Sequence, residues 1–206
     1  MSSPRHVPGY WRRHSAAFLR WLHIYLSMVS FGILFFFALT GITLNHAAWF
    51  DAGATRSSSH KGRVNAAWVG ATDPGDVQRL EIVESLRAAH AIRGALGEFN
   101  VYDDQCMVSF RGPGYTADVA IDRATGNYEL TETRMGFVAV LNDLHKGRDT
   151  GAVWSAVIDL SAGLMILVSL TGFALIFYLR RRRRGGLTAM VVGGLACLLV
   201  YLLLVP

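Results

Sequence analysis

Three of the seven histidines stand beside long apolar segments, where an imidazole could ligate a metal ion at the edge of a membrane. His23 lies at the start of the first apolar segment, His46 just beyond its end, and His145 just before the second. His23 and His46 are separated by about 35 Å along a helix, so they cannot bind the same ion. His46 and His145 can, if the two helices that they flank are neighbours.

The histidines are positioned by three apolar segments, each long enough to cross a bilayer. Residues 22–44 contain no charged side chain, and as a helix they would be about 35 Å long, more than the ~30 Å of hydrocarbon. The second segment is interrupted only by Asp159, and the third has no charge. The sequence therefore predicts transmembrane helices over residues 21–45, 152–179 and 187–205.

The basic residues predict how these helices are oriented. Arginines cluster before the first span and directly after the second, and neither cluster contains an acidic residue. Every acidic residue except Asp159 lies between the first two spans. The positive-inside rule places residues 1–20 and the Arg-rich loop 180–186 in the cytoplasm and residues 46–151 outside. The net charge of +5 is thus a topology signal, and no nucleic-acid partner is expected.

The segment between the first two spans has the pattern of a small α+β domain. Residues 51–62 are rich in Ser, Gly and Ala and predict a linker. Asp73-Pro74-Gly75-Asp76 opens an amphipathic helix from Val77 to Ala89, with Gly94 as its stop. Turn residues then separate four predicted strands, over 98–102, 107–111, 115–121 and 128–131. One helix and an antiparallel meander predict an α+β domain at about residues 62–135.

The order of these elements, with four short motifs, resembles the PepSY-associated transmembrane proteins. Leu22-His23 opens the first span and Leu39-Thr40-Gly41 lies near its end. Leu144-His145-Lys146-Gly147 leads into the second span, which closes with Leu170-Thr171-Gly172. The resemblance covers about residues 18–184 and implies a small three-helix member, with a PepSY-like outer domain, in the bacterial inner membrane. Relatives include reductases of ferric siderophores that hold b-type haem on histidine pairs, so haem b is the cofactor that the resemblance implies.

A haem iron held by two neutral imidazoles suits electron transfer, and facing helices can supply one imidazole each. We therefore expect His46 and His145 to ligate an outer haem and His23 to help hold an inner one. The cytoplasmic side offers only His6 and His14, or the same residue of a second subunit, as the partner of His23. The expectation is one or two haems per chain or shared in a dimer, and a homodimer or a partner membrane subunit.

Gly41 and Gly172 lie near the two haem depths, where a missing side chain would let the flat porphyrin approach the backbone. Asp159 lies about two turns inside the second span, where a carboxylate is costly without a partner. It either hydrogen-bonds a ligating histidine or, protonated, joins two helices. The alternatives for the other residues also remain open, since boundary histidines reach towards headgroups and Leu-Thr-Gly can simply pack helices.

Together these features predict an inner-membrane b-type haem protein that passes electrons to an acceptor outside, in the reduction of a ferric siderophore or another metal complex. A cytoplasmic or quinone donor would supply the electrons. The alternative is a non-enzymatic PepSY module, tethered by the helices, that modulates a peptidase or serves a metal or siderophore uptake system. No G-x-G-x-x-G fingerprint and no H-E-x-x-H zinc spacing is present. Enzyme status therefore stays open, and membrane lipids are the remaining expected partner.

Overall fold

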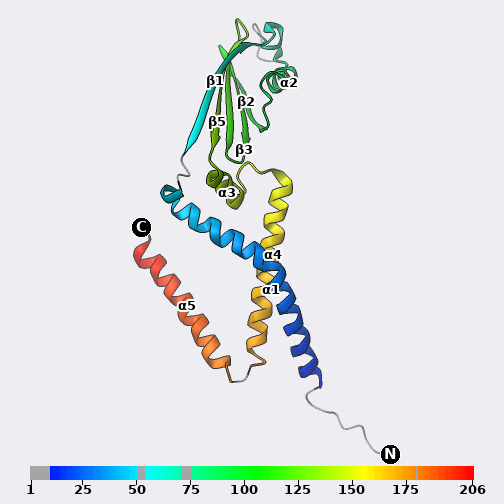
Figure 1. The fold of residues 1–206 in the computed structure, drawn as a ribbon, viewed down its shortest axis with the longest axis vertical. Helices are drawn as coiled ribbons and strands as arrows, with labels where there is room; N and C mark the ends of the chain where they lie inside the picture. The colour runs from blue at the N-terminus through cyan, green and yellow to red at the C-terminus, as the bar shows by residue number, and fades with distance from the viewer. Residues whose placement is uncertain (1–9, 51–53, 71–75, 180) are drawn as a thin grey trace, which may run out of the picture. The chain divides into compact units, whose positions relative to one another are not determined.

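The computed structural model describes residues 10–50, 54–70, 76–179 and 181–206. They divide into two compact units. One unit contains residues 36–158, and the other contains the described residues up to Phe35 together with those from Asp159 onwards. The elements of both units are labelled in Figure 1.

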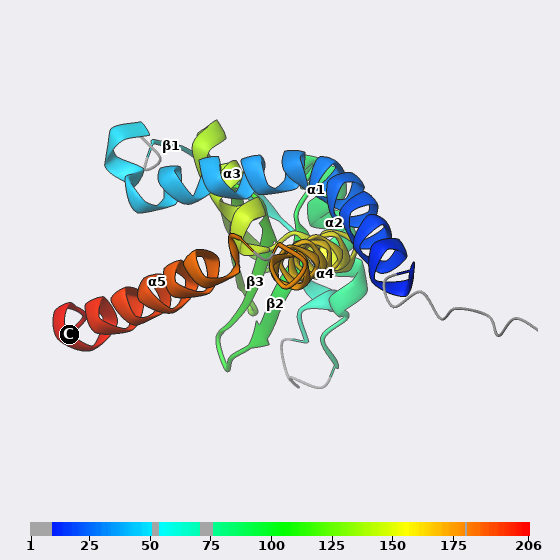
Figure 2. The same cartoon turned by 90° about the horizontal axis from the view of Figure 1, so that it is seen from below.

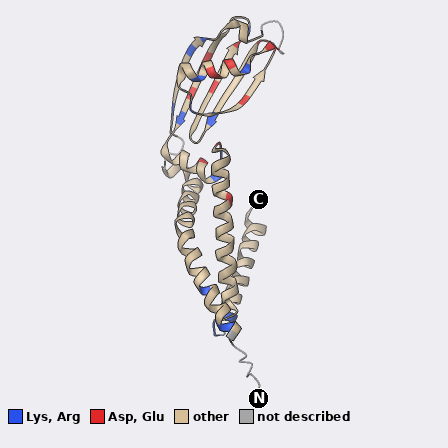
Figure 3. Cartoon of the chain, turned by 90° about the vertical axis from the view of Figure 1, so that its right-hand side faces the viewer, with Lys and Arg blue, Asp and Glu red and all other residues tan. Residues whose placement is uncertain are grey.

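Three helices are long and apolar enough to cross a membrane, which confirms the predicted number of spans. They are α1 (Tyr10–Asn45), α4 (Gly151–Ile176) and α5 (Arg183–Leu204). Figure 2 shows α4 nearly end-on and α5 from the side, and in Figure 3 all three helices are free of charge over most of their length. Helix α1 begins well before the predicted span, because no glycine or proline interrupts residues 10–20. Helix α5 likewise begins inside the predicted Arg-rich loop.

The predicted α+β domain is present, built on a five-stranded antiparallel sheet of order β1-β5-β4-β3-β2. Four strands lie where the sequence predicts them and are a few residues longer: β2 (Ala95–Val101), β3 (Gln105–Gly112), β4 (Tyr115–Asp122) and β5 (Asn127–Met135). We call β1 to β5 with helix α2 the sheet domain.

Strand β1 (Thr55–Arg63) corrects the predicted linker at residues 51–62, of which 51–53 lie outside the described residues. It pairs with β5 alone, from Thr55 opposite Met135 to Arg63 opposite Asn127, and most of its side chains are exposed. An edge strand that buries so little needs no apolar alternation. The pattern on which strand prediction depends is therefore missing from its sequence.

Helix α2 (Arg79–His90) covers one face of the sheet and buries Ile82, Val83 and Leu86 in a core shared with the strands. The helix ends at Ala91, which takes the left-handed conformation, and not at Gly94 as predicted. A Cβ at Gly94 would lie 3.0 Å from the main-chain nitrogen of Arg111, so this glycine allows a close approach between β2 and β3. Residues 73–75 of the predicted opening turn lie outside the described residues.

Two buried side chains of the sheet domain carry polar or reactive groups. Cys106 is completely buried, and burial raises the pKa of its thiol. Arg123 is 4% exposed, and its guanidinium donates to the carbonyl oxygens of Val69 and Tyr102 at 3.1 and 2.9 Å. It also donates to those of Gly70 and Asp103. Arg123 therefore holds two loops together with one buried charge.

A short helix that the sequence analysis missed, α3 (Phe137–Lys146), connects the sheet domain to α4. It starts after Gly136 and ends at Gly147, whose φ of 68° is the left-handed conformation of a helix C-cap. One side of α3 is buried through Ala139 and Asn142. Because His145 lies in the last turn of this helix, its side chain is held by secondary structure, and not by the start of the second span.

Candidate functional site

His23 packs against the Leu-Thr-Gly motif of α4. The imidazole Nδ1 of His23 lies 2.9 Å from Oγ1 of Thr171, which is 7% exposed. A Cβ added to Gly172 would lie 3.1 Å from Cε1 of the same ring, tighter than an ordinary van der Waals contact. The absence of a side chain at Gly172 therefore leaves room for the imidazole of His23. We call His23, Thr171 and Gly172 the His23 cluster.

His145 packs in the same way against the Leu-Thr-Gly motif of α1. Its Nδ1 lies 2.6 Å from Oγ1 of Thr40, which is 1% exposed, and a Cβ at Gly41 would lie 3.8 Å from its Cε1. The edge of the ring meets Phe37, with the ring centroids 5.1 Å apart. We call His145, Thr40 and Gly41 the His145 cluster. The sequence analysis placed each glycine at the depth of a haem, and here each glycine faces an imidazole.

Two contacts of the Thr43 hydroxyl adjoin the His145 cluster. The hydroxyl of Thr43 lies 2.8 Å from Oδ1 of Asn142 and 2.8 Å from the carbonyl oxygen of Thr40, and both side chains are buried. On the other side of α3, the indole N–H of Trp154 donates to the carbonyl of Leu144 at 2.8 Å. Helix α3, and with it His145, is therefore tied to both α1 and α4.

The threonine hydroxyls determine which nitrogen of each histidine carries the proton. Each hydroxyl has one hydrogen, and each donates it to a main-chain carbonyl one turn earlier, at 2.7 Å for Thr40 and 2.9 Å for Thr171. With its hydrogen on the carbonyl, each hydroxyl oxygen accepts from the imidazole, and this arrangement corresponds to the tautomer with the proton on Nδ1 in His23 and in His145. The lone pair of Nε2 is left free in a neutral ring, which is the form that ligates a metal.

His46 has different surroundings. Its ring stacks on Trp49, with centroids 3.8 Å apart and planes 9° apart, and its Nε2 lies 3.3 Å from the amide nitrogen of Asn45. Within the described residues, no hydrogen bond or ring contact joins His46 to His145. Their pairing around one iron stays a prediction.

The remaining candidates are spread along α1 and α4. His14 lies in α1 and not in a tail, nine residues from His23, which places the two side chains on opposite sides of the helix and about 14 Å apart along it. A shared ion is therefore ruled out for this pair within one straight helix, and His6 lies outside the described residues. Asp159 is exposed on α4 and has no hydrogen bond or ion pair with any described residue. Both of its predicted roles stay predictions.

Sequence reasoning missed the two threonines as functional residues, although it quoted their motif. It assigned a role at the haem only to the adjacent glycines, and its alternative for the whole Leu-Thr-Gly motif was helix packing. The signal that could have found them is the repetition of Leu-Thr-Gly in two helices together with the two Leu-His pairs. Among the described residues there is no group of three or more His, Cys, Asp or Glu side chains that could hold a metal ion.

Comparison with known proteins gives one match. A family model described as Putative PepSY_TM-like matches residues 17–206, which is nearly the whole chain. Among curated proteins and among solved structures, none matches.

Proposed function

Because the chain belongs to the putative PepSY_TM-like family, we propose that it is a b-type haem protein that passes electrons across the bacterial inner membrane. The observation that carries the proposal is the repeated hydrogen bond from a histidine Nδ1 to a buried threonine hydroxyl. A ligating histidine typically donates its other ring N–H to a fixed acceptor, which sets the orientation of the ring. The occurrence of the same arrangement twice in one chain supports the proposal of two ligands.

The residues present suit a haem. Both rings are half-buried, and each packs against a glycine that has no side chain to displace it. In the proposal His145 would hold the iron of an outer haem together with His46, whose ring would first turn away from Trp49. Haem iron with two imidazole ligands exchanges single electrons and has no open position for other chemistry.

In the proposal the inner haem would be held by His23 and by a histidine of a second copy or of a partner membrane subunit. The helix geometry excludes His14, and His6 lies outside the described residues. The exposed carboxyl of Asp159 supports an assembly, because a carboxyl on a membrane-spanning helix is costly without a polar partner. A haem at each cluster would divide the ~30 Å of hydrocarbon into shorter electron hops.

The proposed acceptor is a ferric siderophore or another metal complex outside the cytoplasm, where the positive-inside rule places the sheet domain. The electrons would come from a quinol or a cytoplasmic reductant. The role of the sheet domain would be to hold the acceptor near the outer haem, since its strand face opposite α2 is polar and open.

The test is the absorption spectrum of the full-length chain, purified in detergent from haem-replete cells. We expect a Soret band and a six-coordinate low-spin spectrum, with a pyridine haemochrome count of one or two haems per chain. His145→Ala and His23→Ala should each lower the count, whereas His60→Ala, in the exposed strand β1, should leave it unchanged. His46→Ala should convert the outer haem to a high-spin form.

Colourless wild-type protein with a folded sheet domain would contradict the proposal. The family assignment and the helices would then fit the alternative function, a membrane-tethered PepSY module that acts on a peptidase or in metal uptake.

A further inference from the structure

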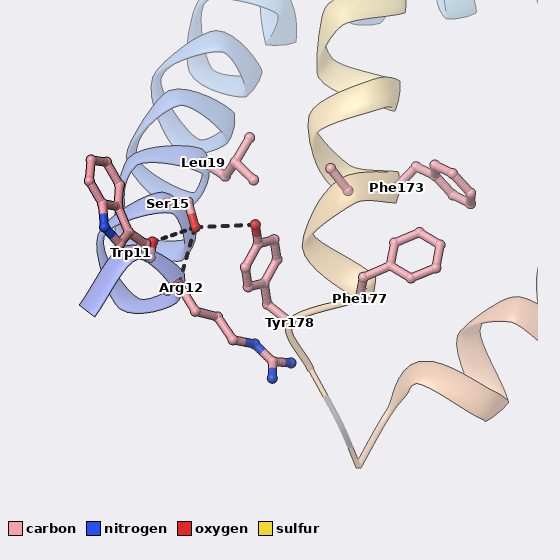
Figure 4. Close-up of a pocket in the computed structure, with 8 residues that line it drawn as sticks. Trp11, Arg12, Ser15, Leu19, Phe173, Phe177 and Tyr178 are labelled. Atoms are coloured by element: carbon pink, nitrogen blue, oxygen red, sulfur yellow. Dashed lines mark hydrogen bonds between the residues drawn. The ribbon is translucent and has the colours of Figure 1, made fainter. Parts of the chain in front are cut away.

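A hollow of about 720 Å³ lies between the first turns of α1 and the last turns of α4, in the same unit as the His23 cluster. Its lining includes Leu19 from α1, Phe173 from α4 and Phe177 from the turn after α4, and these side chains are drawn in Figure 4. Two hydroxyls meet inside it, where Tyr178 donates to Oγ of Ser15 at 3.2 Å. The hollow is therefore lined by both apolar and polar side chains, as a site at the boundary between acyl chains and headgroups would be.

A second hollow of about 360 Å³ adjoins the first, since Arg12 and Tyr178 line both. Arg13 and Arg20 also line it, so three arginines contribute to the lining of one small space. The side chains of Leu175 and Leu179 complete its wall. Clustered arginines beside an apolar surface are the residues expected at a binding site for an anionic amphiphile.

The three arginines have no ion pair with any described residue. The only acidic side chain in this unit is Asp159, and it lies seventeen residues before the end of α4, about 26 Å along that helix. The anion that balances these charges must therefore come from outside the chain. The positive-inside rule places this end of the helices at the cytoplasmic leaflet, where the anionic lipids of the membrane carry its negative surface potential.

We propose that these two hollows bind one anionic phospholipid, with its phosphate among Arg12, Arg13 and Arg20 and an acyl chain along Phe173 and Phe177. Guanidinium groups bind phosphate oxygens in pairs of parallel hydrogen bonds, which favours arginine over lysine at such a site. The bound lipid holds α1 and α4 together on the cytoplasmic side of the His23 cluster. The site is independent of haem, and its existence does not rest on the proposed function.

The test is native mass spectrometry of the full-length chain in detergent, titrated with phosphatidylglycerol and, separately, with phosphatidylcholine. The wild type should retain phosphatidylglycerol and release phosphatidylcholine. The variant Arg12→Gln/Arg13→Gln/Arg20→Gln should bind phosphatidylglycerol roughly a hundredfold more weakly, as each arginine near the surface contributes about fivefold. The matched control is Arg181→Gln/Arg182→Gln/Arg183→Gln, which removes the same charge from the same side, and it should change the affinity by less than about threefold.

Two further measurements make the result decisive. Phe177→Ala should weaken phosphatidylglycerol but leave binding of glycerol phosphate alone unchanged, because only the lipid has an acyl chain. If the triple variant does not fold, Arg20→Gln alone should lower affinity about fivefold. Equal losses in the two triple variants, binding of phosphatidylcholine as tight as that of phosphatidylglycerol, or recovery of a quinone from the hollow would each overturn the proposal.

Discussion

The sheet domain and the long helices bury opposite kinds of side chain. All but one of the buried hydrophobic residues belong to the sheet domain and its adjoining loops, whereas the buried residues of α1 and α4 are hydroxyl-bearing: Ser30, Thr40, Thr43, Ser161 and Thr171. The large apolar side chains of those helices are exposed. The hydrophobic effect buries apolar side chains in the core of the sheet domain. Lipid provides no such driving force between helices, so small polar side chains determine where membrane helices contact one another. The two clusters lie at these polar contacts.

The largest expected difference between the regions concerns phenylalanine. Phe110 is fully buried in the sheet domain, and Phe31 is 64% exposed on α1. Phe110→Ala should lower the free energy of unfolding of the sheet domain by about 3–5 kcal/mol, because it removes buried area and leaves a cavity. Phe31→Ala should change it by less than about 0.5 kcal/mol. Urea denaturation of the full chain in detergent measures both, and similar losses would break the comparison.

Removing the buried hydroxyls tests the helical region. Thr40→Val and Thr171→Val keep the shape of the side chain but leave a histidine N–H without its acceptor, a cost of about 1–3 kcal/mol. If the clusters hold haem, affinity should also fall by about 10–100-fold.

Thr40→Ser and Thr171→Ser are the matched controls, since they keep the hydroxyl, and they should restore haem affinity. The imidazole ¹⁵N shifts of the haem-free protein provide a second measurement, which should show protonated Nδ1 in the wild type and a mixture of tautomers in the valine variants. Valine variants with unchanged shifts and affinity would show that the hydrogen bonds do not fix the rings.

Two glycines give a smaller contrast. A Cβ at Gly62 in β1 would lie 2.4 Å from the hydroxyl oxygen of Tyr128, whereas one at Gly193 in α5 would meet nothing within 4 Å. Gly62→Ala should therefore destabilise the sheet domain by about 1–3 kcal/mol, as overpacking does. Gly193→Ala should be neutral or stabilise its helix by up to about 1 kcal/mol. Thermal unfolding followed by circular dichroism distinguishes them, and a stable Gly62→Ala variant would show that Tyr128 moves aside freely.

The smallest expected effect is a pH dependence of the stability of the sheet domain. Burial, and then the nearby His60 ring at 5.3 Å between centroids, lower the pKa of His90, whose Nε2 is 2.8 Å from the Tyr128 hydroxyl. A lowered pKa means that the unfolded chain binds the proton more readily, so stability falls as the pH drops below about 6.5.

His60→Asn removes the second cause and should reduce this loss between pH 7.5 and pH 5.5. Melting temperatures of the wild type and the variant at the two pH values provide the check. An equal loss in both would mean that His60 does not affect the protonation of His90.

The membrane helices and most of the sheet could be predicted because each follows one strong pattern. Uninterrupted apolar runs indicate the spans, and turn residues between short runs indicate strands β2 to β5. Strand β1 and helix α3 could not be predicted, since β1 is almost wholly exposed and α3 is short and lies beside a span.

The histidine clusters were only half predictable. The depths of Gly41 and Gly172 follow from counting residues along helices, but a hydrogen bond such as that from His145 to Thr40 joins residues 105 apart in the chain. No local periodicity records that contact. One sequence can suggest which residues share a depth in the membrane, but it does not say which face of one helix meets which face of another.

The buried Cys106 provides a chemical probe for local opening of the sheet domain. Its side chain is inaccessible and its raised pKa keeps the sulfur in the poorly nucleophilic thiol form, so a maleimide should react only when β3 separates from its neighbours. Cys197 lies exposed on α5, where detergent or lipid surrounds it. With Cys197→Ser in place, the alkylation rate of Cys106, the single remaining thiol, would report local unfolding of the domain directly within an intact membrane.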